Sequence, residues 1–513
     1  MALTLNLPPV EARPANPPEI RPAKVGPWLD ETGRREPVLA ARLIGDALAA
    51  TNRVAMSDSK RLELAEQYWN VATLLWPQLE KHFVRASHPL TGDALEAAKA
   101  SLTLASELAT AYKHLLAHEA DKRIALGGQR LMVALVHRCL QCTARILVNS
   151  YLSYAPVPPH TWHDAHVIYM FARNRNIHLV PVAPDQPEAT PERLAIQSLL
   201  LALANPYGFL PGQLPIVLRY VQEYAHWAKL TDVVPVHRMA KAVAIVPVGH
   251  DFPPFSANKG GSIDGSKLFL LTFDLAFQIQ EQLQALEAGG DVPAGIGRES
   301  TARLQYIALL KRLLRQWAIP PARQFNRLPS RARVVTCAGL PGIWQYSRGV
   351  HAGVERPAGL PPMANCQVIN HTPAGYALRQ TDSVPTALRI GELVALRIEG
   401  RTGLQVAMVR WFRNTLKGSG LEFGCELLSD NPEAAAAGPE GGTEGLLTPV
   451  VVLPEDNAGN QDGTPPQVLV PASTFGLEQA ITLRRGGSTG FAVLTKLVEQ
   501  GPGFELYEFV DVG

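Results

Sequence analysis

Arginines recur at short intervals in one segment of the chain, where three prolines in and just before the segment prevent a regular helix. A guanidinium group presents a planar fork of N–H donors that matches phosphate oxygens and the O6 and N7 atoms of guanine. We therefore expect an arm that wraps a small dianion, with a solvated hinge as the alternative. The segment reads Arg323-Gln-Phe-Asn-Arg327-Leu-Pro-Ser-Arg331-Ala-Arg333.

A polar turn follows about forty residues later and brings together three residue types that suit a nucleotide. The amide of Asn370 can pair with a base edge, the hydroxyl of Thr372 can bond a phosphate, and Gly375 permits close backbone approach. The sequence predicts a second half of an anion site here, and a plain hairpin turn is the alternative.

The histidines and cysteines of the helical region are expected to have structural roles instead of binding a metal ion or reacting. His160, His163 and His166 step by three, so they drift around a helix instead of converging on a metal ion. Cys139 and Cys142 lie within an apolar helical pattern and read as packing thiols. The chain also lacks a nucleophile elbow, an HExxH motif and a kinase motif set, so we expect no enzymatic activity, no metal site and no cofactor.

Stripes of apolar residues spaced three and four apart predict two packed helices, one from Leu62 to Phe83 and one from Leu95 to Leu116. This succession of helices predicts an all-α bundle or solenoid over residues 36–316, after a Pro-rich, disordered tail over residues 1–35. Further helices are expected at 37–55, 128–153, 161–174, 191–204, 213–229, 266–288 and 299–316.

Past Pro320 the pattern changes to short β-branched or aromatic runs separated by Gly, Pro or Asn. These runs predict an antiparallel β-domain over residues 317–430, with the arginine arm at its start. A stretch rich in Pro, Gly and Ala predicts a linker over 431–445, and later strand-like runs predict a small acidic β-domain over 446–513. The expected fold class is multidomain α + β.

The 513-residue chain is 46% hydrophobic and 18% charged, which indicates folded domains. Its formal net charge of only +2 gives no overall electrostatic attraction to nucleic acid or to an anionic membrane. Basic charge is local, because residues 301–350 contain nine basic side chains and no acidic one. The sequence contains five scattered cysteines, no export signal and no run of about 18 uncharged apolar residues. We therefore expect a cytoplasmic protein without a membrane span.

Arm, turn and following strands together resemble the PilZ domain, a family of six-stranded β-barrels that binds cyclic di-GMP. That family carries an R-x-x-x-R arm before the barrel, a D/N-x-S-x-x-G motif on it, and later strands like VAMVRWF and SGLEFGCELL of this chain. The arm matches in two registers, at Arg323 and Arg327 or at Arg327 and Arg331. The resemblance covers about residues 320–430, and the helical and C-terminal regions are not assigned to a family.

Two departures from the family pattern stand beside the expected ligand face. Thr372 replaces the family's serine but keeps the hydroxyl. Residues 347–363 form an insertion between the first two strands, which either leaves the ligand face open or covers it. The resemblance implies that one set of residues clamps cyclic di-GMP and another forms the floor beneath it: Arg323, Arg327 and Arg331 in the arm, and Asn370, Thr372 and Gly375 in the turn.

The resemblance implies a non-catalytic, cytosolic, bacterial effector of cyclic di-GMP, in which the helical region binds an unidentified protein partner. Because the arm follows the last predicted helix, its ordering on a ligand could reorient that region. The alternative is a scaffold or adaptor protein with a degenerate barrel that binds no nucleotide. Nucleic-acid binding is a weaker third hypothesis, since aromatic residues are not interleaved with the arginines.

Overall fold

The computed structural model places the chain in two compact units, one of Met1–Ala86 with Gly92–Arg323 and the other of Ser87–Thr91 with Gln324–Gly513. Each unit is described by itself below. The structure describes residues 3–122, 128–233, 242–257, 265–297, 299–318, 325–349, 363–382, 388–401, 403–414, 420–440, 447–455 and 465–512.

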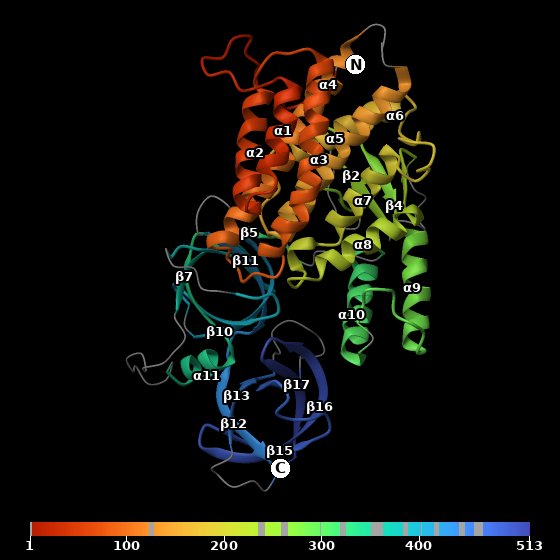
Figure 1. Cartoon of the computed structure of the whole chain (residues 1–513). Helices are drawn as coiled ribbons and strands as arrows, with labels where there is room; N and C mark the ends of the chain where they lie inside the picture. Colours follow the sequence, from red (N-terminus) through yellow and green to blue (C-terminus); the bar gives the residue numbers. More distant parts are fainter. Residues whose placement is uncertain are drawn as a thin grey trace. The chain divides into compact units, whose positions relative to one another are not determined.

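Helices make up most of the first unit, and the long ones run side by side (Figure 1). The predicted helix pair is confirmed: α3 and α4 pack together, and the Tyr112 hydroxyl on α4 donates to Glu66 Oε1 on α3 at 2.8 Å. The helices are α1 (Pro22–Thr32), α2 (Pro37–Asn52), α3 (Asp58–Phe83), α4 (Gly92–Asp121), α5 (Gly128–Leu152), α6 (Thr161–Asn174), α7 (Pro191–Leu203), α8 (Leu214–Tyr224), α9 (Phe273–Glu287) and α10 (Ser300–Trp317).

A small antiparallel sheet interrupts the helices of this unit, in the order β1-β4-β2-β3. Its strands are β1 (Lys229–Thr231), β2 (Val243–Val246), β3 (Phe255–Ser256) and β4 (Leu268–Leu271). The expected helix over 266–288 therefore begins only at Phe273. A short, continuous apolar run such as LFLL reads equally well as a buried strand or a buried helix, so periodicity cannot separate them.

The N-terminal residues are ordered against the helices, which corrects the expected disordered tail over 1–35. Helix α1 begins at Pro22, where a missing N–H costs nothing, and buries Val25 and Leu29. Upstream of it, the Glu11 N–H donates to the Arg53 carbonyl at 2.7 Å, and the Ala55 N–H donates to the Glu11 carbonyl at 2.9 Å. Proline content alone does not predict disorder when apolar residues at helical spacing follow.

Helix α5 is long and apolar enough to cross a membrane, with a mean hydropathy of 1.5 over 18 residues. However, 61% of that window is buried inside the structure, as is typical of the core helix of a folded domain. Within the described parts of the chain, no other helix passes this test.

The middle region forms the expected antiparallel barrel, in which the six strands β7-β6-β9-β10-β11-β8 close through the β7–β8 pairing. Leu378, Phe412 and Phe423 fill the interior and are almost completely buried. The short strand β5 (Leu328–Pro329) pairs with the end of β7, beyond the residues of β7 that pair with β6. The barrel strands are β6 (Arg333–Ala338), β7 (Ala364–Thr372), β8 (Gly375–Gln380), β9 (Leu393–Ile398), β10 (Gln405–Asn414) and β11 (Leu421–Ser429).

A second closed barrel ends the chain, in the order β12-β13-β14-β17-β16-β15. Its first strand, β12 (Glu433–Pro439), lies where a linker was expected over 431–445, so that expectation is wrong for these residues. Ala435 and Ala437 point into the barrel core, and β12 pairs with a strand on each side. The other strands are β13 (Thr448–Leu453), β14 (Gln467–Pro471), β15 (Ala480–Arg485), β16 (Ser488–Gly501) and β17 (Phe504–Asp511).

Besides the interior of each barrel, one hydrophobic cluster is formed by residues of both barrels. Helix α11 (Leu340–Gly349) lies between them in Figure 1, and Ile343 on this helix packs in one cluster with Met408 of the first barrel and Phe504 of the second. The Trp344 indole N–H also donates to the Ala435 carbonyl at 2.6 Å. This cluster joins the two barrels within the second compact unit.

We predict that Leu29→Ala lowers the free energy of unfolding by about 2–5 kcal/mol, because it empties a fully buried site on α1. The matched control is Leu74→Ala on α3, where the side chain is 69% exposed and its loss should cost little. Chemical denaturation of the full chain measures both. Equal stability of the two variants would contradict the packing of α1.

Candidate functional site

The arginine arm lies alongside the polar turn, at the edge of the middle barrel. Strand β5 pairs antiparallel with β7, with Leu328 opposite His371 and Pro329 opposite Asn370. Arg327 and Arg331 stand immediately before and soon after this short strand, and both are exposed. Two segments that are distant in sequence therefore meet at one place on the barrel.

Asn370 belongs to a row of residues that crosses four strands on the outer surface of the barrel. It lies opposite Ala377, Ala377 lies opposite Gly424, and Gly424 lies opposite Trp411. The neighbouring row, which contains Leu378, is buried in the barrel interior, and successive residues of a strand point to opposite faces. The row of Asn370 consequently faces outwards, and its two small residues, Ala377 and Gly424, form the floor between Asn370 and Trp411.

Trp411 supplies an aromatic wall to this floor. A Cβ atom at Gly424 would lie 1.9 Å from the Trp411 indole nitrogen, so the ring lies directly over the glycine. The Arg413 guanidinium carbon is 5.6 Å from the centre of the Trp411 ring. Sequence analysis gave neither side chain a role, although their two-residue spacing in VAMVRWFRN places both on the outer face.

Gly375 closes the turn where two backbones touch. Its φ is 154°, and a Cβ there would lie 2.1 Å from the Cys425 carbonyl oxygen on β11. The Thr372 hydroxyl, partly buried at the other end of the turn, donates to the Gly375 carbonyl at 3.5 Å. The motif glycine is thus required by the fold itself, before any ligand is considered.

An arginine pair neutralises the carboxylate at one end of the outer face. Arg379 and Arg413 donate to the two oxygens of Glu422, at 2.8 and 2.7 Å. Burial alone would raise the pKa of Glu422, but these hydrogen bonds outweigh burial, so the pKa lies below its usual value. At neutral pH the carboxylate is therefore ionised, and its pairing with two arginines leaves one net positive charge at this end of the face.

The other end of the face is connected to the C-terminal barrel. Arg410 donates to Glu426, which lies opposite Gly375, at 2.6 Å, and to Glu499 of β16 at 3.0 Å. This link holds the β16 strand of the second barrel beside the polar turn.

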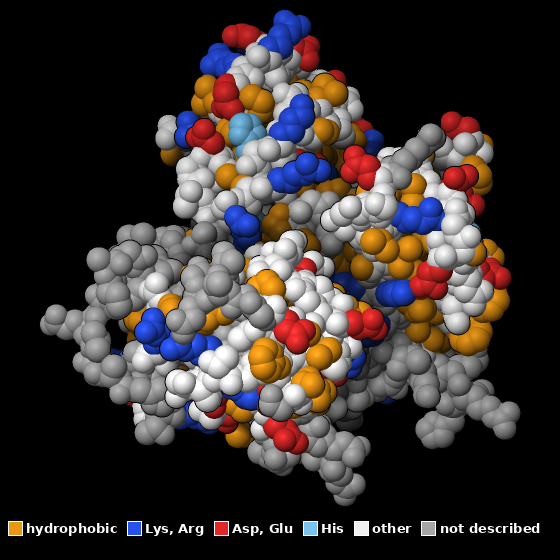
Figure 2. Space-filling model, turned by 90° about the horizontal axis from the view of Figure 1, so that it is seen from below, with side chains coloured by type: hydrophobic (Ala, Val, Ile, Leu, Met, Phe, Trp, Pro, Cys, Tyr) orange, Lys and Arg blue, Asp and Glu red, His pale blue; other side chains and the backbone are white. Residues whose placement is uncertain are grey.

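Much of the basic charge expected at the junction serves the helical unit. Arg303 donates to backbone carbonyls at the end of α9, Lys311 pairs with Glu287 at 2.7 Å, and Arg312 donates to the Gly208 carbonyl at 2.6 Å. Figure 2 shows Lys and Arg side chains scattered over the visible face instead of gathered in one patch. The count of basic residues in this segment therefore overstates the positive charge that is available to a ligand.

The structure brings Arg327, Arg331, Asn370, Thr372 and Gly375 together in the β5–β7–β8 region. Arg323 lies outside the described residues, as do residues 350–362 of the expected insertion, whose first residues end α11. The pairing places Arg327 and Arg331 on either side of β5, whereas the ligand roles of all these residues stay predictions.

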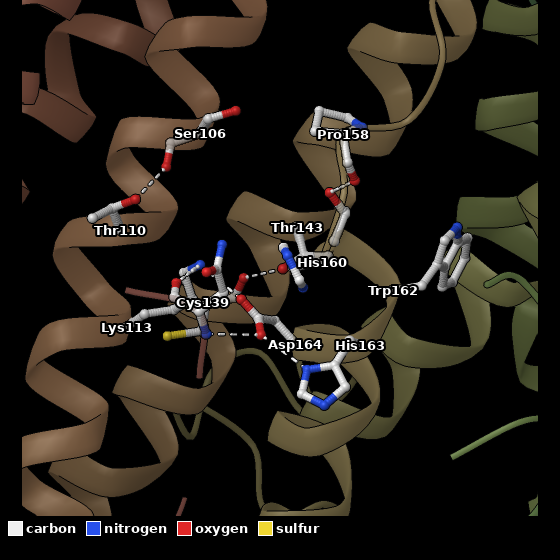
Figure 3. A network of polar contacts seen from close by, with 12 residues as sticks. Ser106, Thr110, Lys113, Cys139, Thr143, Pro158, His160, Trp162, His163 and Asp164 are labelled. Atoms are coloured by element: carbon white, nitrogen blue, oxygen red, sulfur yellow. Dashed lines mark hydrogen bonds and ion pairs between the residues drawn. The ribbon is translucent and has the colours of Figure 1, made fainter. Parts of the chain in front are cut away.

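The histidines of α6 take part in helix packing (Figure 3). Lys113 of α4 donates to the buried carboxylate of Asp164 at 2.8 Å, and His163 Nδ1 lies 3.3 Å from the same carboxylate. His166 is buried, and both cysteines of the α5 pair are buried free thiols. In the described part of the chain, no group of three or more His, Cys, Asp or Glu could hold a metal ion.

Comparison with known proteins agrees with this architecture along most of the chain. Three family models match: the N-terminal domain of the cyclic-di-GMP receptor FimW at residues 23–236, its middle PilZ domain at 352–434, and its C-terminal β-barrel domain at 434–512. The cyclic-di-GMP receptor FimW of Pseudomonas aeruginosa is 22% identical over 481 residues, covering 80% of this chain and 77% of the relative. The resemblance of the middle barrel to the PilZ family is confirmed.

We predict that Gly375→Ala lowers the free energy of unfolding of the second unit by about 1–3 kcal/mol, because the added Cβ collides with the β11 backbone. Gly490→Ala is the matched control, since no atom lies within 4 Å of a Cβ there. Thermal denaturation followed by circular dichroism compares them. A Gly375→Ala variant as stable as the control would refute the close contact.

Proposed function

We propose that this protein is a non-catalytic receptor for cyclic di-GMP, from the premise that its middle region is a PilZ domain between an N-terminal helical domain and a C-terminal β-barrel. One observation carries the proposal: the pairing of β5 with β7 sets Arg327 and Arg331 beside the turn from Asn370 to Gly375. Cyclic di-GMP offers two phosphates and two guanines, and the face offers donors suited to both.

Each side chain would have a distinct task in such a complex. The arm arginines, Arg323 included, would bond phosphate oxygens and guanine edges through their planar donor forks. Asn370 would pair with a base edge, and Thr372 would donate its hydroxyl to a phosphate. Trp411 would give a guanine a surface on which to stack.

The rest of the chain fits an effector that acts by binding. The groups on the barrel face are of types that hold a ligand, and the matched relative is named as a receptor, so we assign no catalytic step to the protein. We infer a cytoplasmic location, where a nucleotide messenger is available to the barrel. The helical domain would then be the surface for a protein partner.

The alternative is a scaffold protein whose barrel no longer binds nucleotide. It differs from the receptor in one measurable property, because titration of the full chain with cyclic di-GMP would then give no heat at high micromolar concentration.

We predict that Arg327→Ala weakens binding of cyclic di-GMP by about one to two orders of magnitude, since a charge-assisted hydrogen bond contributes about 1.5–3 kcal/mol. Asn370→Ala should have a smaller effect because its bonds are between neutral groups. Arg397→Ala is the control, as this exposed arginine lies on β9 of the same barrel and away from the turn. Titration calorimetry measures all three variants.

If the Arg327→Ala and Asn370→Ala variants both bind cyclic di-GMP with the affinity of the parent, the ligand site lies elsewhere. A parent chain that binds no cyclic di-GMP at all supports the scaffold alternative instead.

We predict that Trp411→Ala weakens the same interaction by about tenfold or more, because stacking of a base on an aromatic ring contributes about 1–3 kcal/mol. Trp411→Phe keeps an aromatic face and should stay close to the parent. Trp227→Ala, which removes a 39% exposed indole from the helical unit, should not change affinity. Equal affinity of the Ala and Phe variants at position 411 would exclude stacking there.

A further inference from the structure

The loop between α3 and α4 belongs to the barrel unit, although both helices belong to the helical unit. Residues Ser87–Thr91 group with the barrels, so the chain passes from one unit to the other and back within five residues. His88 and Leu90 in this loop are only 3% and 4% exposed. Such burial is unusual for a short connection between helices, because loops normally lie at the surface.

His88 makes three kinds of contact with the barrel. Its Nδ1 accepts a hydrogen bond from the Asn414 amide at 2.7 Å, because the amide nitrogen can only donate. Its ring packs against Phe412, with 4.8 Å between ring centres. Its carbonyl accepts from the Leu388 N–H at 3.3 Å.

Burial keeps this histidine neutral. It lowers the pKa of His88 to about 4 despite the hydrogen bond with Asn414, which acts in the opposite direction. At neutral pH the ring is uncharged, with its proton on Nε2 and its Nδ1 lone pair available to Asn414.

Strand β10 connects this loop to the outer face of the barrel. Phe412 and Asn414 point inwards, 1% and 2% exposed, and contact His88. Trp411 and Arg413 alternate with them and point outwards, over Gly424 and towards Glu422. A change in the position of this strand end must therefore move both sets of side chains.

We propose that His88 is a positioning residue for the nucleotide site: the α3–α4 loop, which belongs to the barrel unit, holds the end of β10 and thereby sets Trp411 and Arg413 on the ligand face. This inference rests on the proposed function and deepens it, since it makes the site depend on a residue far outside the PilZ domain. By thermodynamic linkage, a ligand that fixes the position of Trp411 also stabilises the contact of the α3–α4 loop with β10.

The test is calorimetric titration of the full-length chain and its variants with cyclic di-GMP. His88→Ala should weaken binding by about tenfold, within the range measured for coupled neighbouring residues. His88→Asn should restore affinity to within about threefold of the parent, because its Oδ1 can accept from Asn414 where Nδ1 did. His88→Leu keeps apolar packing on Phe412 but lacks the acceptor, and should bind as weakly as His88→Ala.

His166→Ala is the matched control, because His166 is also a buried histidine, 5% exposed, but lies on α6 and bonds the Phe252 carbonyl. It should lower thermal stability and leave affinity unchanged. The Asn and Leu variants decide the question even if His88→Ala does not fold.

Three results would overturn the inference: parental affinity in the Leu variant, equal affinities in the Asn and Leu variants, or equal loss in the His88 and His166 variants. In each of these cases the parent still binds cyclic di-GMP, so the proposed function survives. A parent that does not bind refutes both.

Discussion

The close approach of β8 to β11 is the constraint on which the candidate site depends. Gly375 and Gly424 leave no room for a side chain, since a Cβ would meet the Cys425 carbonyl at one position and the Trp411 ring at the other. This contact fixes the register in which Asn370, Ala377, Gly424 and Trp411 share one outward row. The arm then pairs with the end of β7, at Asn370 and His371, beyond the residues of β7 that pair with β6.

Packing and ion pairs hold this face in place. Residues of both barrels and of α11 form one hydrophobic cluster, and Arg410 joins Glu426 of one barrel to Glu499 of the other. A binding face built on such strands keeps its geometry better than one built on loops. The described part of the arm is held to β7 through β5 and through backbone hydrogen bonds of Ser330 and Ala332, but its arginine side chains are exposed, so a ligand can order them further.

The sequence was sufficient to identify local patterns and the family motif. Apolar spacing predicted the α3–α4 pair, and the arginine arm with the Asn370 turn predicted the middle barrel. It failed for β12, because alanine, glutamate and glycine have low strand propensity and form a strand here only through pairing on both sides. It also missed the contact of His88 with Asn414, which joins residues 326 positions apart and leaves no periodic signal.

Hydrogen exchange of the full-length chain, with and without saturating cyclic di-GMP, tests the central claim most directly, because it reports where a ligand orders the backbone. The account predicts slower exchange in residues 325–332 of the arm and in residues 370–376 of the turn, both on the outer face of the barrel. Binding confirmed by calorimetry, with unchanged exchange in both segments and protection in another part of the chain, would contradict it.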